Sequence, residues 1–159
     1  MRYYLTLCFG LFATLNAGSG HAATEQVSTQ LNWYTNYQDA LRAGQAASKP
    51  IALLFTGSDW CGWCIKLEQE ILSSPAFAEA AGNKFVFVKV DFPKRTSLSA
   101  SQQQQNEALQ QKFGITGYPT IILVDPAQQK VIASTGYQAG GPKAFADHLS
   151  RLANKNNPS

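Results

Sequence analysis

The stretch FTGSDWCGWCIKLEQEIL, Phe55–Leu72, contains two cysteines, Cys61 and Cys64, with only two residues between them. It overlaps the apolar run Ile51–Phe55, and after the cysteines apolar and charged residues recur with roughly helical spacing. A short continuous apolar run suits a strand that is covered on both faces. The stretch therefore predicts a central parallel strand that leads into a helix. Cys61 is expected at or just before the first helical turn, and Cys64 one turn further on.

Three kinds of chemistry could use such a cysteine pair. A zinc site needs two further Cys or His ligands at suitable spacing, and His148 is the only other such residue after position 23. A purely structural disulfide would close a loop too short to remove much entropy from the unfolded chain. The third possibility, a redox-active dithiol, is the one we favour.

A helix N-terminus explains why the pair suits redox chemistry. Unpaired backbone N–H groups and the positive end of the helix dipole lower the pKa of a thiol there, which makes Cys61 the expected nucleophile. Cys64 is then the resolving thiol, which attacks a mixed disulfide on Cys61. Gly62 is expected to permit the tight turn between them, and Trp63 to shield the pair or to offer a flat contact to substrate.

The first 23 residues predict a cleaved export signal. Arg2 supplies a positive charge, Leu5–Leu15 an apolar core, and small residues lead to a cleavage site after Ala22 or Ala23. The apolar core is too short to span a bilayer, for which about 20 residues are needed. Cys8 lacks the preceding small residue that a lipoprotein signal would have. The predicted organisation is a signal peptide (1–23), a lead-in (24–32), one domain (33–153) and a flexible tail (154–159).

Composition restricts the class of protein further. Of the 159 residues, 45% are hydrophobic and 14% are charged, which is typical of a folded domain. Cleavage would remove one of 13 basic residues and none of 10 acidic ones, so the mature charge would be +2. This is not the basic surface of a nucleic-acid-binding protein, so we expect no nucleic-acid partner. An exported chain also meets an oxidising environment, in which cysteine pairs form disulfides.

The segment before the cysteines predicts a short strand and an amphipathic helix. The strand covers Leu31–Tyr34, Thr35 or Asn36 caps the helix, and Pro50 ends it. The residues on the apolar side of this helix share helical spacing: Tyr37, Ala40, Leu41 and Ala47.

Beyond the cysteine helix, Ser74 is expected to cap a short helix that has Pro75 at its first position. The alternation in Phe85–Asp91 predicts a strand. The polar, glutamine-rich segment that follows leaves open whether 93–100 is disordered or ordered. From 101 to 113 it predicts a helix, which Gly114 ends.

The last third of the chain predicts a β-hairpin and a closing helix. The strand YPTIILVD is followed by the turn PAQQ and by KVIASTG, which pairs back antiparallel, and a helix begins at Pro142. Together the segments predict an α/β fold with a central mixed sheet, in which a parallel βαβ unit joins an antiparallel hairpin and helices cover both faces.

Two motifs resemble the thioredoxin superfamily. WCGWC, Trp60–Cys64, is similar to its WCxxC active site, and GITGYPT, Gly114–Thr120, is similar to a segment whose proline is cis. The similarity runs over about 33–152, and FTGSDWCGWC is most like exported, periplasmic oxidoreductases of the Dsb type. The resemblance implies a thioredoxin-like fold and a redox-active Cys61–Cys64 disulfide, without metal or other cofactor. It also implies that Tyr118, Pro119 and Thr120 form a platform for substrate. The alternative is that Tyr118 is simply a surface aromatic residue and Pro119 a strand-edge residue.

The sequence departs from the family at the acid that helps to deprotonate the resolving thiol. Leu54 and Phe55 occupy the positions where the family carries a buried carboxylate near the end of the central strand. Asp59 is the nearest acid; it is expected to be exposed and is a candidate for tuning a thiol pKa. Lys89 matches the lysine that pairs with the missing acid, so we expect it to tune a thiol pKa, to pair with Asp91, or merely to extend from its strand.

The resemblance implies a thiol:disulfide oxidoreductase that reduces disulfides of protein substrates and receives electrons from a membrane-embedded dithiol carrier. Trp63 stands where thioredoxin has proline, and this position leaves isomerase and oxidant activities open. Another alternative is a client-binding module that uses Trp60, Trp63 and Tyr118 as a surface and rarely turns over. We expect the protein to be a monomer.

Overall fold

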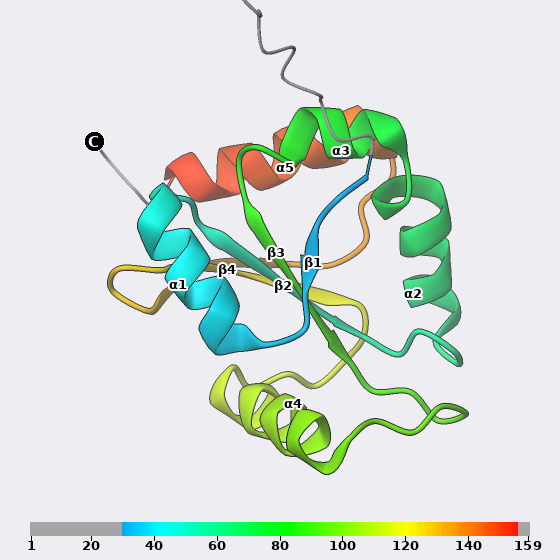
Figure 1. The fold of residues 1–159 in the computed structure, drawn as a ribbon. Helices are drawn as coiled ribbons and strands as arrows, with labels where there is room; N and C mark the ends of the chain where they lie inside the picture. Colours follow the sequence, from blue (N-terminus) through cyan, green and yellow to red (C-terminus); the bar gives the residue numbers. More distant parts are fainter. Residues whose placement is uncertain (1–29, 156–159) are drawn as a thin grey trace, which may run out of the picture.

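A computed structural model describes residues 30–155, so the expected signal peptide and residues 156–159 lie outside the described part of the chain. Its centre is a five-stranded mixed sheet (Figure 1). The strands, in order across the sheet, are β1 (Trp33–Tyr34), β3 (Val86–Asp91), β2 (Ile51–Thr56), β4 (Thr120–Asp125) and β5 (Lys130–Thr135). The first three are parallel, while β4 and β5 run antiparallel to their neighbours. This confirms the predicted mixed sheet, in which β2 is central but parallel to β3 only.

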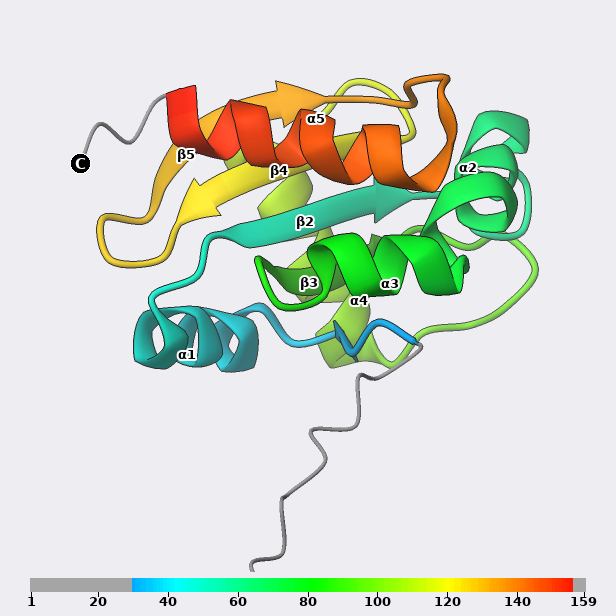
Figure 2. The same cartoon turned by 90° about the horizontal axis from the view of Figure 1, so that it is seen from above.

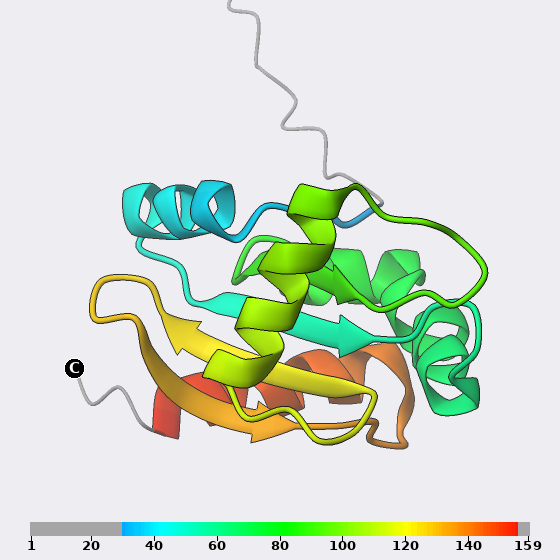
Figure 3. The same cartoon turned by 90° about the horizontal axis from the view of Figure 1, so that it is seen from below.

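Helices cover both faces of the sheet. In Figure 2, α3 and α5 lie in front of the strands, whereas in Figure 3, seen from the opposite side, α4 crosses in front of them. The helices are α1 (Tyr37–Ala47), α2 (Gly62–Leu67), α3 (Pro75–Ala81), α4 (Ala100–Lys112) and α5 (Gly141–Lys155). A turn of π-helix, η1 (Glu68–Leu72), continues α2. The β2 arrow points toward α2, which places the cysteine motif at the carboxyl end of the central strand (Figure 2).

The central strand explains why the two layers form. Every residue of β2 is buried, and its side chains alternate between two apolar clusters. Leu53 belongs to the cluster under α1 and α4, whereas Leu54 belongs to the cluster under α3 and α5. Burial of each such side chain contributes about 1.5–3 kcal/mol to stability. A strand with two apolar faces is therefore stable only between two helical layers.

The buried face of the first helix differs from the prediction at two residues. Asn36 is the N-cap, with its side chain accepting the Asp39 N–H at 3.0 Å. Ala47, expected in the apolar stripe, is exposed, and Gly44 is buried instead. A Cβ on Gly44 would lie 3.0 Å from the Lys49 carbonyl oxygen, so the close approach of the chain after the helix explains the glycine there.

Several boundaries also differ. The strand predicted over 31–34 is limited to Trp33–Tyr34. Helix α4 starts at Ala100, where Ser99 caps it, and ends at Lys112. Helix α5 continues through Lys155, two residues into the segment expected to be a flexible tail. Ser74 and Pro75 occupy the predicted cap and first position of α3. Within residues 30–155, no helix has the length and apolar character needed to cross a membrane.

Candidate active site

Cys61 and Cys64 form a disulfide at the start of α2, with their Cα atoms 5.2 Å apart. Cys61 is the N-cap of the helix, and its sulfur accepts the N–H of Cys64 at 3.2 Å. Both side chains are largely buried, but Cys61 is 8% exposed and Cys64 only 3%. The first cysteine is thus the more accessible, and it lies where the unpaired N–H groups of the helix favour a thiolate.

The turn between β2 and α2 depends on a glycine at position 57 rather than at position 62. Cys61 N–H donates to the Gly57 carbonyl at 2.9 Å. A Cβ on Gly57 would lie 2.5 Å from the indole of Trp60, so only glycine leaves room for this ring against the turn. A Cβ on Gly62 would meet nothing within 4 Å, and Gly62 is not among the residues with positive φ. The expectation that Gly62 permits a tight turn was therefore wrong.

Trp60 is fixed between the cysteine turn and two other segments. Its indole Nε1 donates to the Phe92 carbonyl at 2.7 Å. Its ring meets Tyr118 edge-on, with ring centroids 5.9 Å apart, and the Lys94 ammonium lies 4.0 Å from the ring centroid. The structure thus brings Trp60 and Tyr118 together, although 57 residues lie between them in sequence.

Tyr118 and Pro119 precede β4 and are joined by a cis peptide bond. The Tyr118 hydroxyl accepts a hydrogen bond from Gln110 at 2.7 Å, and burial raises the pKa of this phenol. Thr120 pairs with Phe55 across the β2–β4 ladder and donates its hydroxyl to the Gly117 carbonyl. Backbone pairing thereby places this loop at the same end of the sheet as the cysteine motif.

Asp59, which was expected to be exposed, is half-buried and binds the loop that follows β3. Its carboxylate accepts the backbone N–H groups of Lys94 at 2.9 Å and Arg95 at 2.7 Å. These bonds, that of Lys94 first, lower the pKa of Asp59. Of the segment 93–100, whose order the sequence left open, residues 93–99 form an ordered loop tied to the residue two positions before Cys61, and Ala100 begins α4.

Trp63 contacts an aromatic residue that the sequence did not single out. Its side chain is 60% exposed, and its ring centroid lies 5.4 Å from that of Tyr137, in the segment between β5 and α5. The Tyr137 hydroxyl donates to Glu70 at 2.8 Å, and this hydrogen bond raises the pKa of Tyr137. Glu70 also forms an ion pair with Lys66, whose hydrogen bond is the main cause of the lowered Glu70 pKa.

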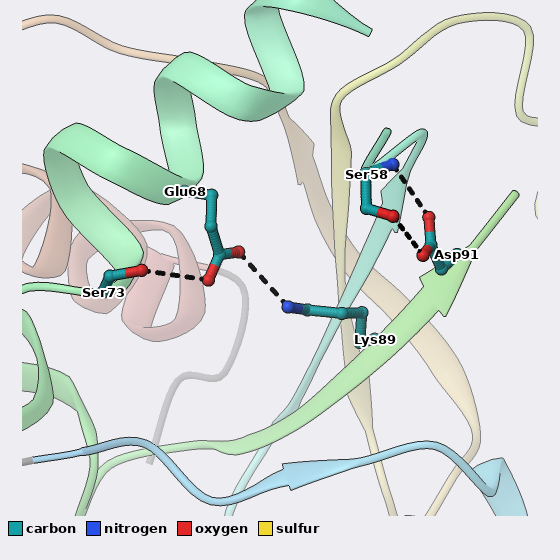
Figure 4. Close-up of polar contacts among 5 residues, drawn as sticks. All are labelled: Ser58, Glu68, Ser73, Lys89 and Asp91. Carbon is teal, nitrogen blue, oxygen red and sulfur yellow. Dashed lines mark hydrogen bonds and ion pairs between the residues drawn. The ribbon is translucent and has the colours of Figure 1, made fainter. Parts of the chain in front are cut away.

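Lys89 has a partner different from the one expected (Figure 4). Its ammonium lies 3.3 Å from a carboxylate oxygen of Glu68, which comes from the first residue of η1. Asp91, the partner considered from the sequence, instead accepts the backbone N–H and the hydroxyl of Ser58 at 2.9 and 2.5 Å. The expectation of a Lys89–Asp91 pair is therefore wrong. The acidic partner of Lys89 is Glu68.

A cavity of about 260 Å³ opens beside the buried cysteine. Seven residues line it: Thr56, Ser58, Cys64, Ile65, Glu68, Gln69 and Lys89. Leu54 and Phe55 have apolar side chains that are buried in the two clusters, so neither contributes a polar group to this cavity. The sequence signal for Glu68 was its position four residues after Cys64, one helical turn further on.

No cluster of three or more His, Cys, Asp or Glu residues that could hold a metal ion occurs in the described chain. The group with redox chemistry here is the Cys61–Cys64 disulfide itself.

Comparisons with known proteins agree with this geometry. The family model for a thioredoxin-like domain matches residues 37–153. Disulfide bond reductase DsbH of Chlamydia pneumoniae is 39% identical over 122 residues, which cover 77% of this chain and 72% of that protein. Thioredoxin-related protein DsbJ of the same organism is 35% identical over 82% of this chain, which spans only 38% of DsbJ. The solved structure of a DsbH oxidoreductase has a TM-score of 0.75 at 32% identity, covering 92% of this chain and 94% of that one.

A thioredoxin-like α/β fold with a disulfide at the first turn of its active-site helix defines a class of redox proteins. The chain belongs to the thioredoxin-like family, and within it to the thiol:disulfide oxidoreductases of the Dsb type.

Proposed function

We propose that the protein is exported and reduces disulfide bonds of protein substrates. The observation that carries this proposal is the Cys61–Cys64 disulfide, whose first cysteine caps the helix and is the more exposed of the two. The similarity to a protein named as a disulfide bond reductase supports the direction of the reaction. The export signal predicted over residues 1–23 supports the location, which is expected to be the periplasm or another extracytoplasmic compartment.

The reaction proceeds through a mixed disulfide. The Cys61 thiolate attacks one sulfur of the substrate disulfide, so that a Cys61–substrate bond forms and the other substrate sulfur leaves as a thiolate that takes a proton. Cys64 then loses its proton and attacks Cys61 Sγ. The Cys61–Cys64 disulfide forms, and the second substrate thiol is released. Two electrons pass from the protein to the substrate.

We assign substrate contacts to the surface around the disulfide. Trp60 and Trp63 are two of the three exposed large hydrophobic residues in the described chain, and they flank Cys61 on both sides. Tyr118 lies against Trp60, and Pro119 and Thr120 lead from it into β4. A substrate segment that adds to this loop as an extended strand would contact the aromatic rings while its disulfide meets Cys61.

Each cycle leaves the protein oxidised, so it needs an electron donor. Soluble reductants are scarce outside the cytoplasm, and we propose that a membrane-embedded dithiol carrier reduces the Cys61–Cys64 disulfide. In this proposal the protein acts as a monomer.

The test is the equilibrium reduction potential of the pair, measured in defined thiol buffers by tryptophan fluorescence. A value near about −270 mV supports a reductase, whereas a value near about −120 mV contradicts that direction and assigns disulfide formation. In parallel, Cys64→Ser should accumulate a mixed disulfide with substrate that Cys61→Ser cannot form. If Cys61→Ser fully retained the cellular function, a client-binding role would replace the enzymatic one.

A further inference from the structure

The cavity beside Cys64 brings polar side chains close to the resolving thiol, although this thiol is buried. Cys64 is 3% exposed, yet it borders a space of about 260 Å³ together with the side chains of Glu68 and Lys89. A polar cavity of this size accommodates water molecules, which need two to four hydrogen-bonding partners each. Thr56, Ser58 and Gln69, whose side chains carry hydroxyl or amide groups, also line it.

Glu68 is held at this cavity from two sides. Its Oε2 lies 3.3 Å from the Lys89 ammonium, and its Oε1 accepts the Ser73 hydroxyl at 3.1 Å (Figure 4). One turn of helix separates it from Cys64, so both side chains lie on the same side of the helix. Lys89 comes from β3, where it is paired with Leu54 of β2. Leu54 gives this lysine no acidic neighbour on the strand, and Glu68 of the helical segment supplies the carboxylate instead.

The other acids near the motif have different partners. Asp91 is bonded to Ser58, and Asp59 binds the loop at Lys94 and Arg95. Glu70 pairs with Lys66 and Tyr137, outside the cavity. Among the described residues, Glu68 supplies the only carboxylate in the lining of the cavity.

We propose that Glu68 accepts the proton of Cys64 when the mixed disulfide is resolved, and that Lys89 positions its carboxylate for this transfer. This inference rests on the proposed reduction of disulfides by Cys61. The proton moves from Cys64 Sγ through water in the cavity to a Glu68 carboxylate oxygen. The Cys64 thiolate attacks Cys61 Sγ, the bond from Cys61 to substrate breaks, and the leaving thiolate takes a proton from solvent. Glu68 then returns its proton to solvent, so protons and electrons balance.

The test separates the two chemical steps without a protein client. One equivalent of 5,5′-dithiobis(2-nitrobenzoate) is mixed with the reduced protein in a stopped-flow instrument. Attack by Cys61 releases a first coloured thiolate, and resolution by Cys64 releases a second. In Glu68→Gln the second phase should slow by about a hundredfold at pH 7, the scale of one general base, while the first phase is retained. The deficit should shrink as the pH rises above about 8.5, where an ordinary thiol ionises unaided.

Glu70→Gln is the matched control, because it removes an ion-paired carboxylate from the same π-helical turn without touching the cavity. It should leave both phases unchanged. Glu68→Asp should restore part of the lost rate, and Lys89→Met should slow the second phase while the first persists. An unchanged second phase in Glu68→Gln, or equal slowing in Glu70→Gln, overturns the role of Glu68. Absence of the first phase in the wild-type protein would instead contradict the assignment of Cys61 as the nucleophile. A high reduction potential would contradict only the proposal that the protein reduces its substrates, and would leave the role of Glu68 as it is.

Discussion

Asp59 binds the backbone of a loop that comes from a distant part of the sequence. Two consecutive N–H groups, of Lys94 and Arg95, point at its carboxylate. Hydrogen bonds to the ionised form favour that form, which explains why the Asp59 pKa is lowered. The side chain therefore fixes the loop most strongly when it is charged.

Asp59→Asn should lower the urea midpoint of unfolding at pH 7. Because the folded pKa is depressed, the charged Asp59 stabilises the fold above its ordinary pKa of about 3.9. This stability is lost as the pH falls through the lower, folded pKa. The wild-type and variant midpoints should therefore converge in acid. A constant difference at every pH would show that charge on Asp59 is not the cause.

Tyr37 is a second residue at which a single polar group, its hydroxyl, affects the stability of the fold. Its side chain is 4% exposed, and among the described residues its hydroxyl has no hydrogen-bond partner. A buried hydroxyl without a partner costs roughly 1–3 kcal/mol in desolvation. Tyr37→Phe should therefore raise the free energy of unfolding by about 1 kcal/mol. Denaturant titration measures this change, and a loss of stability would mean that the hydroxyl makes a stabilising interaction.

At the scale of elements, the turn between β2 and α2 is joined to the loop 93–99, because Asp59 accepts the N–H groups of Lys94 and Arg95 and the Lys94 ammonium lies over the Trp60 ring. Trp60 itself is packed against Gly57. In Gly57→Ala the new methyl group would overlap the indole and displace it from Tyr118 and Lys94. We expect a several-fold higher KM for a disulfide-bonded protein client.

A small disulfide reagent is the control for Gly57→Ala, because it needs no aromatic surface. Its reaction with Cys61 should be nearly unchanged in the variant. Equal losses with both substrates would place the defect at the dithiol rather than at the substrate surface.

The elements themselves were largely predictable, since apolar periodicity and capping residues determine them locally. The Ser74 cap and the apolar run of β2, which is buried on both faces, are examples of such local signals. The partner of Lys89 was not predicted, although Glu68 has the right helical spacing from Cys64. Their meeting depends on where the fold places η1 relative to β3, which a single sequence does not specify. The π-helical turn, where Ser73 N–H reaches the Glu68 carbonyl five residues back at 2.9 Å, also has no local sequence signal.

At the scale of the whole molecule, the reduction potential of the disulfide and the stability of the fold are linked through one thermodynamic cycle. A dithiol pair is hard to reduce when the oxidised folded state is the more stable one, and strong oxidants have the opposite preference. If the protein is a reductase, its oxidised form should unfold at higher urea concentration than its reduced form.

Parallel urea titrations with and without dithiothreitol measure this difference. Cys64→Ser, which cannot close the disulfide, should be insensitive to the reductant. A reduced form that is more stable than the oxidised one would contradict the reductase assignment and agree with an oxidant.

The segment 93–99 has its ends secured independently of its middle. On one side Phe92 N–H donates to the Thr56 carbonyl at 2.9 Å, and on the other Ser99 caps α4. Between these points the segment also binds the cysteine turn, because Lys94 and Arg95 donate their N–H groups to Asp59. A change in the length or charge of this loop would therefore reach the dithiol as well, through the two residues that precede Cys61.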